Sequence, residues 1–156
     1  MTPAPKRIGE VLIEKGLIKP WQLDMALQLQ RTNKAFLGAI LVLKGWITEE
    51  ALLTALADQF CLPFVRIAPE QADWAVATRY SPALTEQHVC LAISADQNSV
   101  TVAIANPLDA WAISEVEALA GTKRVNLVLA TVKDIQAAYR YGQEQAAKRL
   151  KMPPRG

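Results

Sequence analysis

The sequence of 156 residues contains few of the residue types that build metal and disulfide sites. It has one histidine, His88, and two cysteines, Cys61 and Cys90, each between apolar neighbours and without a C-x-x-C spacing. A zinc cluster and a disulfide framework do not fit this composition, so we expect no metal and two buried, reduced thiols. His88 and Cys90 share one face of an expected strand with no orienting carboxylate nearby, and we interpret them as structural residues.

Sequence signatures of common enzymes are also missing. The nucleotide-binding pattern G-x-x-x-x-G-K-[ST] does not occur, because Gly121-Thr122-Lys123 has no earlier glycine at the required spacing. The G-x-S-x-G pattern of hydrolases is missing too, and the carboxylates fall mostly on expected helix surfaces, as at Glu49 and Glu50. We therefore expect a chain that is not an enzyme and uses no cofactor.

Long apolar runs and a strong charge of either sign are absent as well. No run approaches the roughly 20 residues of a membrane-spanning helix, and the first six residues lack the apolar segment of a signal peptide. These absences predict a cytoplasmic protein without a membrane span. The net charge of +2 is too small to favour DNA or RNA as a partner, whereas 51% hydrophobic residues suffice for a folded core.

The sequence does contain an internal repeat, which appears when the chain is shifted by 29 residues. The matched segments are Ile8-Gly9-x-x-Leu12 with Leu37-Gly38-x-x-Leu41, Lys15-Gly16-x-Ile18 with Lys44-Gly45-x-Ile47, and Leu23-x-x-Ala26-Leu27-x-x-Gln30 with Leu52-x-x-Ala55-Leu56-x-x-Gln59. The first motif spans residues 7–30 and the second residues 36–59, so each has 24 residues and a five-residue spacer separates them. So many matches without a gap are not expected by chance.

Each motif is typical of a short helix, a glycine stop and a longer helix. Gly16 and Gly45 stand where a left-handed helix cap is expected. Pro20 suits the first turn of a second helix, and Thr48 followed by two glutamates is a typical start for a fourth. Residues 7–60 are therefore predicted to form four short helices in two hairpins.

The pattern changes after residue 60 to short β-rich runs that alternate with helices. The expected strands are 62–67, with Pro63 at a sheet edge, 89–93, 100–104 and 125–130, and the expected helices are 69–78, 110–120 and a last one from Thr131 through Tyr141 to about Leu150. Asp96-Gln97-Asn98 is a good hairpin turn between the second and third strands.

These elements predict an α+β fold, in which a four-helix tandem repeat of two helical hairpins packs on a small, mainly antiparallel α/β subdomain. We expect residues 1–60 to form the repeat and residues 61–142 the α+β part of the same compact module. Residues 143–156 are expected to extend the last helix and end in a loose tail, because Pro153 and Pro154 follow it closely.

The two motifs resemble the tandem motifs of the MshEN domain. The first, Arg7-Ile8-Gly9-x-x-Leu12-Ile13-x-x-Gly16-Leu17-Ile18 continuing to Leu23, Leu27 and Gln30, matches the family motif almost position for position. The second runs from Phe36-Leu37-Gly38 to Gln59 with the family's five-residue spacing. Leu62-Pro63-Phe64-Val65 and the segment 102–109 resemble the rest of the N-terminal domain of type II secretion and type IV pilus ATPases, so the resemblance covers roughly residues 7–142.

The resemblance implies binding of cyclic di-GMP, which would control a secretion, pilus or related envelope machine. The implied partners are this nucleotide and either a secretion or pilus ATPase or an inner-membrane assembly protein. An alternative is a docking module that binds the assembly protein with weak or no nucleotide binding. Exposed tryptophans among Trp21, Trp46, Trp74 and Trp111 would be natural anchors for such docking.

A physical account of the nucleotide site agrees with the resemblance, because a two-fold symmetric dinucleotide can place one half on each motif. An arginine can pair with guanine O6 and N7 or with a phosphate. Glycines allow the ligand to approach the backbone closely near a helix N-terminus. Leucines can form an apolar surface under the bases, and glutamines can make hydrogen bonds to a base or a ribose. The candidate residues are Arg7, Ile8, Gly9, Leu23, Leu27, Gln30, Phe36, Leu37, Gly38, Leu52, Leu56 and Gln59.

Simpler interpretations stand beside these roles. Leucines at this spacing are first of all core residues, and the glutamines alone would be surface residues. Glycine inside a helix costs about 1 kcal/mol, so Gly9 and Gly38 favour a function. Further candidates are Lys34, Asn106 and Asp109; the last two also suit a turn and a helix cap, and the alternative for them is to reach the ligand or pair with Arg7.

The second motif departs from the first at its opening residue. Phe36 stands where an arginine would mirror Arg7. A phenylalanine can stack on a base but cannot donate a hydrogen bond. Lys34, two residues upstream, is an alternative source of positive charge for the second half-site.

Overall fold

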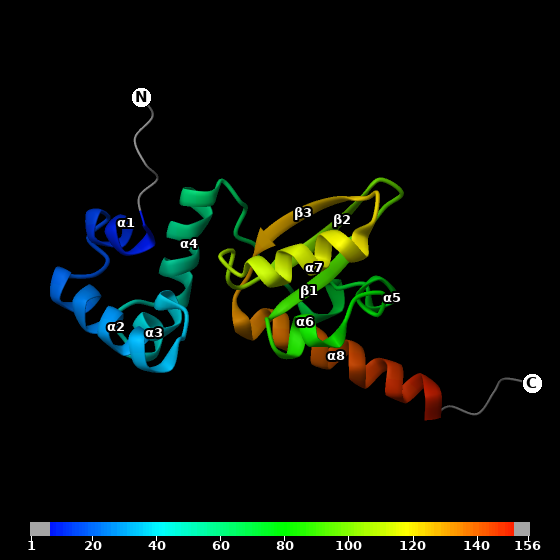
Figure 1. Cartoon of the computed structure of the whole chain (residues 1–156). Coiled ribbons are helices and arrows are strands. Elements are labelled where there is room, and N and C mark those ends of the chain that lie inside the picture. Colours follow the sequence, from blue (N-terminus) through cyan, green and yellow to red (C-terminus); the bar gives the residue numbers. More distant parts are fainter. Residues whose placement is uncertain (1–6, 152–156) are drawn as a thin grey trace, which may run out of the picture. The chain divides into compact units, whose positions relative to one another are not determined.

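The computed structural model describes residues 7–151, and for Lys151 it describes the backbone alone. The expected loose tail therefore lies outside the described residues, as do the first six residues considered for a signal peptide. The chain divides into two compact units, Met1–Cys61 and Leu62–Gly156, whose elements are labelled in Figure 1. Among the described residues, no helix is both long enough and apolar enough to cross a membrane.

The first unit contains the four predicted helices, and its two-hairpin arrangement is confirmed. They are α1 (Ile8–Glu14), α2 (Pro20–Asn33), α3 (Leu37–Leu43) and α4 (Glu49–Phe60). Pro20 is the first residue of its helix, and the Thr48 hydroxyl accepts a hydrogen bond from the N–H of Ala51 at 3.1 Å. Gly16 and Gly45 adopt φ of 72° and 74°, the left-handed conformation that ends the short helices.

The two motifs pack on each other in a reciprocal way. Helix α1 of the first motif contacts α4 of the second, and α3 of the second contacts α2 of the first. Exchanging the motifs converts one contact into the other, as a local two-fold axis would. The repeat-related residues Leu12 and Leu41 are both fully buried, so the same position of each motif contributes to the core.

The second unit is a small mixed sheet with helices around it, and the predicted α+β class is confirmed. Its elements are the 3-10 helix η1 (Pro69–Gln71), α5 (Trp74–Ala77), α6 (Pro82–Glu86), β1 (Cys90–Ala95), β2 (Ser99–Ile104), α7 (Ala110–Ala120), β3 (Arg124–Leu129) and α8 (Val132–Lys151). The strands lie in the order β1-β2-β3. The first pair is the predicted antiparallel hairpin, whereas β2 and β3 are parallel, so only one of the two pairs is antiparallel.

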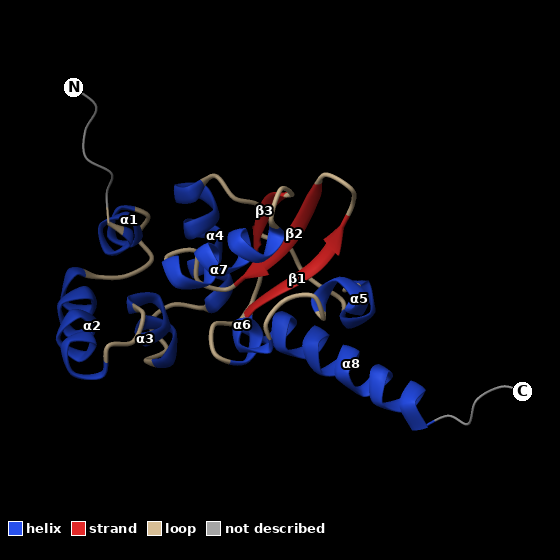
Figure 2. Cartoon of the chain, turned by 45° about the vertical axis from the view of Figure 1, so that its right-hand side comes forward, coloured by secondary structure: helices blue, strands red, loops and turns tan. Residues whose placement is uncertain are grey.

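Helices pack on this sheet through α5, α6 and α8 beside β1 and through α7 beside β3. Figure 2 shows the three strands side by side with α8 passing below them. Leu91, Ala103 and Val128, one from each strand, form a core cluster with Ile135 and Ala138 of α8. Side chains alternate along a strand, so the neighbours of these residues face the other side of the sheet.

Two local predictions for the segment after the repeat are wrong. The expected strand 62–67 is reduced to one isolated parallel bridge between Phe64 and Leu129. Pro63 has no N–H to donate, and the N–H of Ile67 donates to the Asp134 carboxylate at 2.9 Å instead of to a strand. The backbone leaves the ladder because its next hydrogen-bond partner is a side chain.

The expected helix 69–78 is broken into η1 and α5. Ala72 is extended (φ −78°, ψ 131°), the N–H of Asp73 donates to Ile93 of the sheet at 2.8 Å, and the Asp73 carboxylate caps α5 through the N–H of Ala75 at 3.0 Å. The short helix α6 was not predicted, although Ser81 followed by Pro82 is a typical helix start.

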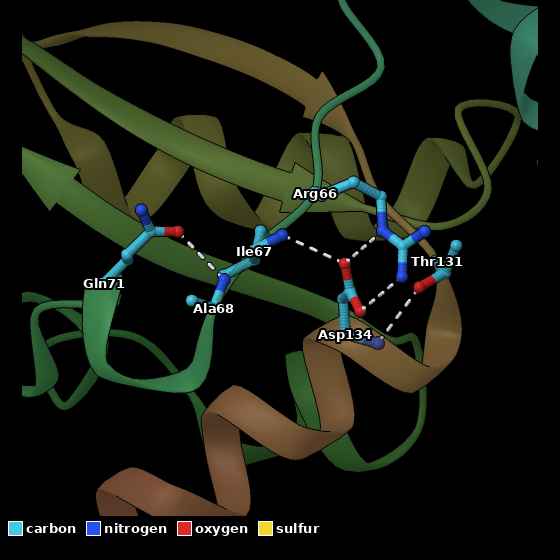
Figure 3. A network of polar contacts seen from close by, with 6 residues as sticks. All are labelled: Arg66, Ile67, Ala68, Gln71, Thr131 and Asp134. Atoms are coloured by element: carbon cyan, nitrogen blue, oxygen red, sulfur yellow. Dashed lines mark hydrogen bonds and ion pairs between the residues drawn. The ribbon is translucent and has the colours of Figure 1, made fainter.

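Asp134 connects the segment around residue 66 to α8, as Figure 3 shows. Its carboxylate accepts hydrogen bonds from Nε of Arg66 at 2.9 Å and from the N–H of Ile67 at 2.9 Å, although only 9% of the residue is exposed. The bond from Arg66 and then that from Ile67 hold the pKa of the carboxyl below its ordinary value, against the opposing effect of burial. Thr131 caps α8 as predicted, through the N–H of Asp134 at 3.1 Å.

Candidate functional site

Arg7 lies at the entry of the first motif with an exposed side chain. It is the residue before α1 and has an extended backbone (φ −71°, ψ 152°). The described part of the chain offers its guanidinium no hydrogen bond or ion pair, so its donors remain available to a ligand. Ile8 and Gly9 follow it and are both buried.

Gly9 and Gly38 each lie under a leucine of the next helix in their own motif. A Cβ atom on Gly9 would lie 2.6 Å from Cδ1 of Leu23, and one on Gly38 would lie 2.7 Å from Cδ2 of Leu52. A side chain at either position would force the leucine above it to shift, so glycine lets the two helices of each hairpin come together. Packing thus gives these glycines a role of its own, beside the ligand contact that stays a prediction.

The four candidate leucines differ between the motifs. Leu23 is half-buried and Leu27 is 39% exposed. Their equivalents Leu52 and Leu56 are 5% and 0% exposed. The first motif thus offers an apolar surface that a base could contact, while the leucines of the second motif belong to the core, as their spacing alone predicts.

Phe36 occupies in the second motif the place that Arg7 has in the first. It also precedes its helix with an extended backbone (φ −62°, ψ 135°), and the buried Leu37 follows it as Ile8 follows Arg7. Cε1 of the Phe36 ring lies 2.9 Å from where a Cβ of Gly38 would be. The ring therefore lies over Gly38 and remains half-buried.

The polar candidate residues of the repeat differ in their exposure and in their hydrogen bonds within the chain. Nε2 of Gln30 donates to the carbonyl of Ala35 at 3.1 Å, which ties the end of α2 to the spacer and leaves the side-chain oxygen for other use. Gln59 is half-buried at the equivalent position of α4. Lys34 is exposed in the left-handed conformation (φ 54°) that ends α2.

Asn106 and Asp109 belong to the second unit and have the turn and cap roles that their sequence also suited. Oδ1 of Asn106 accepts from the N–H of Leu108 at 2.9 Å, and Oδ1 of Asp109 accepts from the N–H of Ala112 at 3.0 Å at the start of α7. Oδ2 of Asp109 lies 2.6 Å from Nδ1 of His88.

Two sequence interpretations of the histidine and cysteines need correction. His88 does have a carboxylate partner, Asp109, and its ring stacks on Trp111 with centroids 4.4 Å apart. Local spacing could not reveal the contact between His88 and Asp109, because these two residues are 21 positions apart in the sequence. Cys61 is exposed, since it ends α4 in a left-handed turn; Cys90 is buried, as expected, and burial, reinforced by the Asp109 charge, raises the pKa of its thiol to about 12.

A family model described as the MshEN domain matches residues 60–147, more than half of the chain. The chain belongs to the MshEN domain family. This match rests almost wholly on the second unit, so it does not by itself bear on the two motifs of the first.

Solved structures extend the likeness to the MshEN motifs. One, described as the structure of MshE with cdg, is 25% identical, covers 87% of this chain and 99% of that chain, and gives a TM-score of 0.73. Such coverage requires the repeat, because the residues after Phe60 are less than two thirds of the chain. The N-terminal domain of XpsE shares the fold, with 20% identity, coverage of 90% of this chain and 98% of that one, and a TM-score of 0.71.

Curated relatives of this MshEN chain are much longer proteins. It is 26% identical over 139 residues to the type IV pilus assembly ATPase PilB of Myxococcus xanthus, covering 89% of this chain and 25% of that protein. The PilB of Thermus thermophilus is 26% identical over 155 residues, covering 98% of this chain and 17% of that protein. The chain therefore spans a quarter or less of the length of these relatives.

Proposed function

We propose that the chain is a regulatory module that binds cyclic di-GMP through its two 24-residue motifs. The observation that carries this proposal is the likeness of nearly the whole chain to MshE solved with cdg, which we take to be cyclic di-GMP. The module acts in the cytoplasm, makes no chemical change to the nucleotide, and controls a type II secretion, type IV pilus or related envelope machine.

The geometry of the first unit supports this role in two ways. The reciprocal packing of the motifs suits a ligand with two-fold symmetry, because each motif presents the same backbone to one half of the ligand. Arg7 and Leu27 of the first motif are both exposed, so this motif can offer a guanine base a bidentate donor and an apolar contact. Glycines under Leu23 and Leu52 let the two helices of each hairpin come together.

Calorimetric titration of the chain with cyclic di-GMP tests the proposal, and we expect saturable binding. Arg7→Ala should weaken binding on the order of 10- to 150-fold, because a hydrogen bond to a charged group contributes about 1.5–3 kcal/mol. Arg31→Ala, which removes an exposed arginine outside the candidate set, is the matched control. Unchanged binding by Arg7→Ala would remove Arg7 from the site, and GTP or GMP that competes at equal concentration would contradict a dedicated sensor.

A docking function is a second candidate, favoured by exposed apolar side chains on the second unit. Trp111 is 50% exposed although it stacks on His88, and Leu108 and Leu119 are exposed around the same helix, α7. Large exposed aromatic residues are typical anchors of protein interfaces. An inner-membrane assembly protein of a secretion or pilus machine is the partner we expect, and Trp111→Ser should abolish its capture while leaving cyclic di-GMP binding unchanged.

A further inference from the structure

We propose that this chain reads one base of its cyclic dinucleotide strictly, at Arg7, and accepts either purine at Phe36. The hybrid cyclic GMP–AMP is then a ligand nearly as good as cyclic di-GMP. This inference rests on the proposed function and adds the class of nucleotide that the site accepts: cyclic dinucleotides with at least one guanine.

The two opening side chains can be compared directly because their surroundings match. Arg7 and Phe36 both have extended backbones directly before a seven-residue helix. Each is followed by a buried aliphatic residue and then by a glycine that lies under a leucine of the same motif. The difference between the half-sites at this position is therefore one of side-chain chemistry and not of backbone path.

Arg7 can tell guanine from adenine. Its guanidinium presents donors only, which match the acceptors O6 and N7 of guanine. Adenine carries an amino donor in place of O6, so the fork loses one hydrogen bond and two donors face each other. A bidentate contact of this kind discriminates on the order of 5- to 150-fold against the wrong base.

Phe36 cannot make this distinction. Its ring, which lies over Gly38, has neither donor nor acceptor, and stacking tolerates any base because every base has a π face. The absence of a Cβ on Gly38 is what lets the ring lie there, since such a Cβ would be 2.9 Å from Cε1 of Phe36.

The other side chains assigned to the second half-site do not restore the distinction. Lys34 is exposed and carries a point charge, which attracts a phosphate but does not read a base edge. Gln59 offers both a donor and an acceptor in its amide, so it can pair with the edge of either purine. Selectivity for guanine at the second position would need the donor fork that Phe36 lacks.

The test is titration of the whole chain with cyclic di-GMP, 3′,3′-cyclic GMP–AMP and cyclic di-AMP. We expect the first two affinities to agree within about threefold, of which a factor of about two comes from symmetry alone, since only one orientation of the hybrid puts guanine on Arg7. Cyclic di-AMP should bind at least about fivefold more weakly. A hybrid that binds tenfold or more weakly than cyclic di-GMP overturns this inference, whereas no binding of any of the three overturns the proposed function.

Phe36→Arg is the decisive variant, because the equivalent position of the first motif already accommodates an arginine. It should make the hybrid at least about fivefold weaker than cyclic di-GMP. Phe36→Leu is the control: it removes stacking from all three ligands and leaves their affinity ratio at the parent value. A ratio unchanged by Phe36→Arg, with far-ultraviolet circular dichroism like that of the parent, would also overturn the inference.

Discussion

The two motifs of the first unit fold alike but differ in which of their equivalent side chains are buried. Both form a short and a long helix around a glycine turn, and both bury the leucine at their sixth position, Leu12 or Leu41, completely. At the position three residues before each motif ends, however, Leu27 is 39% exposed and Leu56 is fully buried. The sequences at these positions are identical, so exposure depends on what packs against each copy and not on the motif itself.

The largest expected difference between the motifs is the loss of stability when Leu27 or Leu56 is replaced by alanine. Leu56→Ala removes a fully buried side chain and should lower the free energy of unfolding of the first unit by about 2–5 kcal/mol. Leu27→Ala should cost below about 1 kcal/mol, because the side chain is already partly in water. Native-state hydrogen exchange of the amides in α1 to α4 measures both values for this unit alone.

The same measurement has an internal control in Leu12 and Leu41. Both are fully buried, so their alanine variants should lose similar stability. If Leu27→Ala proved as costly as Leu56→Ala, the two motifs would contribute equally to the core and the comparison would fail.

A smaller difference is expected at the two glycines. Alanine at either position gains about 1 kcal/mol in helix propensity but meets the leucine above it. Leu23 is half-buried and can shift, whereas Leu52 is buried and Phe36 adds a second close contact at Gly38. We expect Gly9→Ala to be near neutral and Gly38→Ala to destabilise by about 1–3 kcal/mol.

Thermal unfolding of the two alanine variants tests this expectation. The double variant Gly38→Ala/Leu52→Ala should lose less stability than the sum of its two single changes, because the shortened Leu52 side chain removes one of the two close contacts. Equal destabilisation by both glycine variants would mean that Leu23 is as fixed as Leu52.

The repeat also shows how much of the fold the sequence could predict. The helices of the first unit follow from local signals, such as Pro20 at a first turn and the Thr48 cap, and these signals act within four residues. The β1–β2 hairpin is equally local. Periodicity and caps were sufficient for these elements, although the equally local helix α6 was not predicted.

The predictions fail where the partners are distant. The segment after Cys61 was predicted as a regular strand and a regular helix, but Ile67 bonds to Asp134 and Asp73 bonds to the sheet. His88 was expected to have no carboxylate nearby, but Asp109, 21 residues away in the sequence, supplies one. No local pattern carries these contacts, which decide where regular structure ends.

The candidate site was predictable in part for the same reason. The sequence identified the paired positions, such as Arg7 with Phe36, because the repeat aligns them. It could not tell that Gly9 and Gly38 serve the packing of their own hairpins, nor that Leu27 is exposed while its equivalent Leu56 is buried, because both facts depend on contacts between helices.

The smallest expected effect concerns an ion pair that occurs on one side of the repeat alone. Nζ of Lys15 lies 2.9 Å from Oδ2 of Asp58, but at the repeat-related pair of positions Lys44 would meet Leu29, which has no charge. Both partners of the pair are largely exposed, so Asp58→Asn should cost below about 1 kcal/mol and less at high salt. Lys44→Met is the matched control and should show no salt-dependent change in urea unfolding. A loss of several kcal/mol in Asp58→Asn would mean that this pair, and not the buried leucines, makes the two motifs unequal.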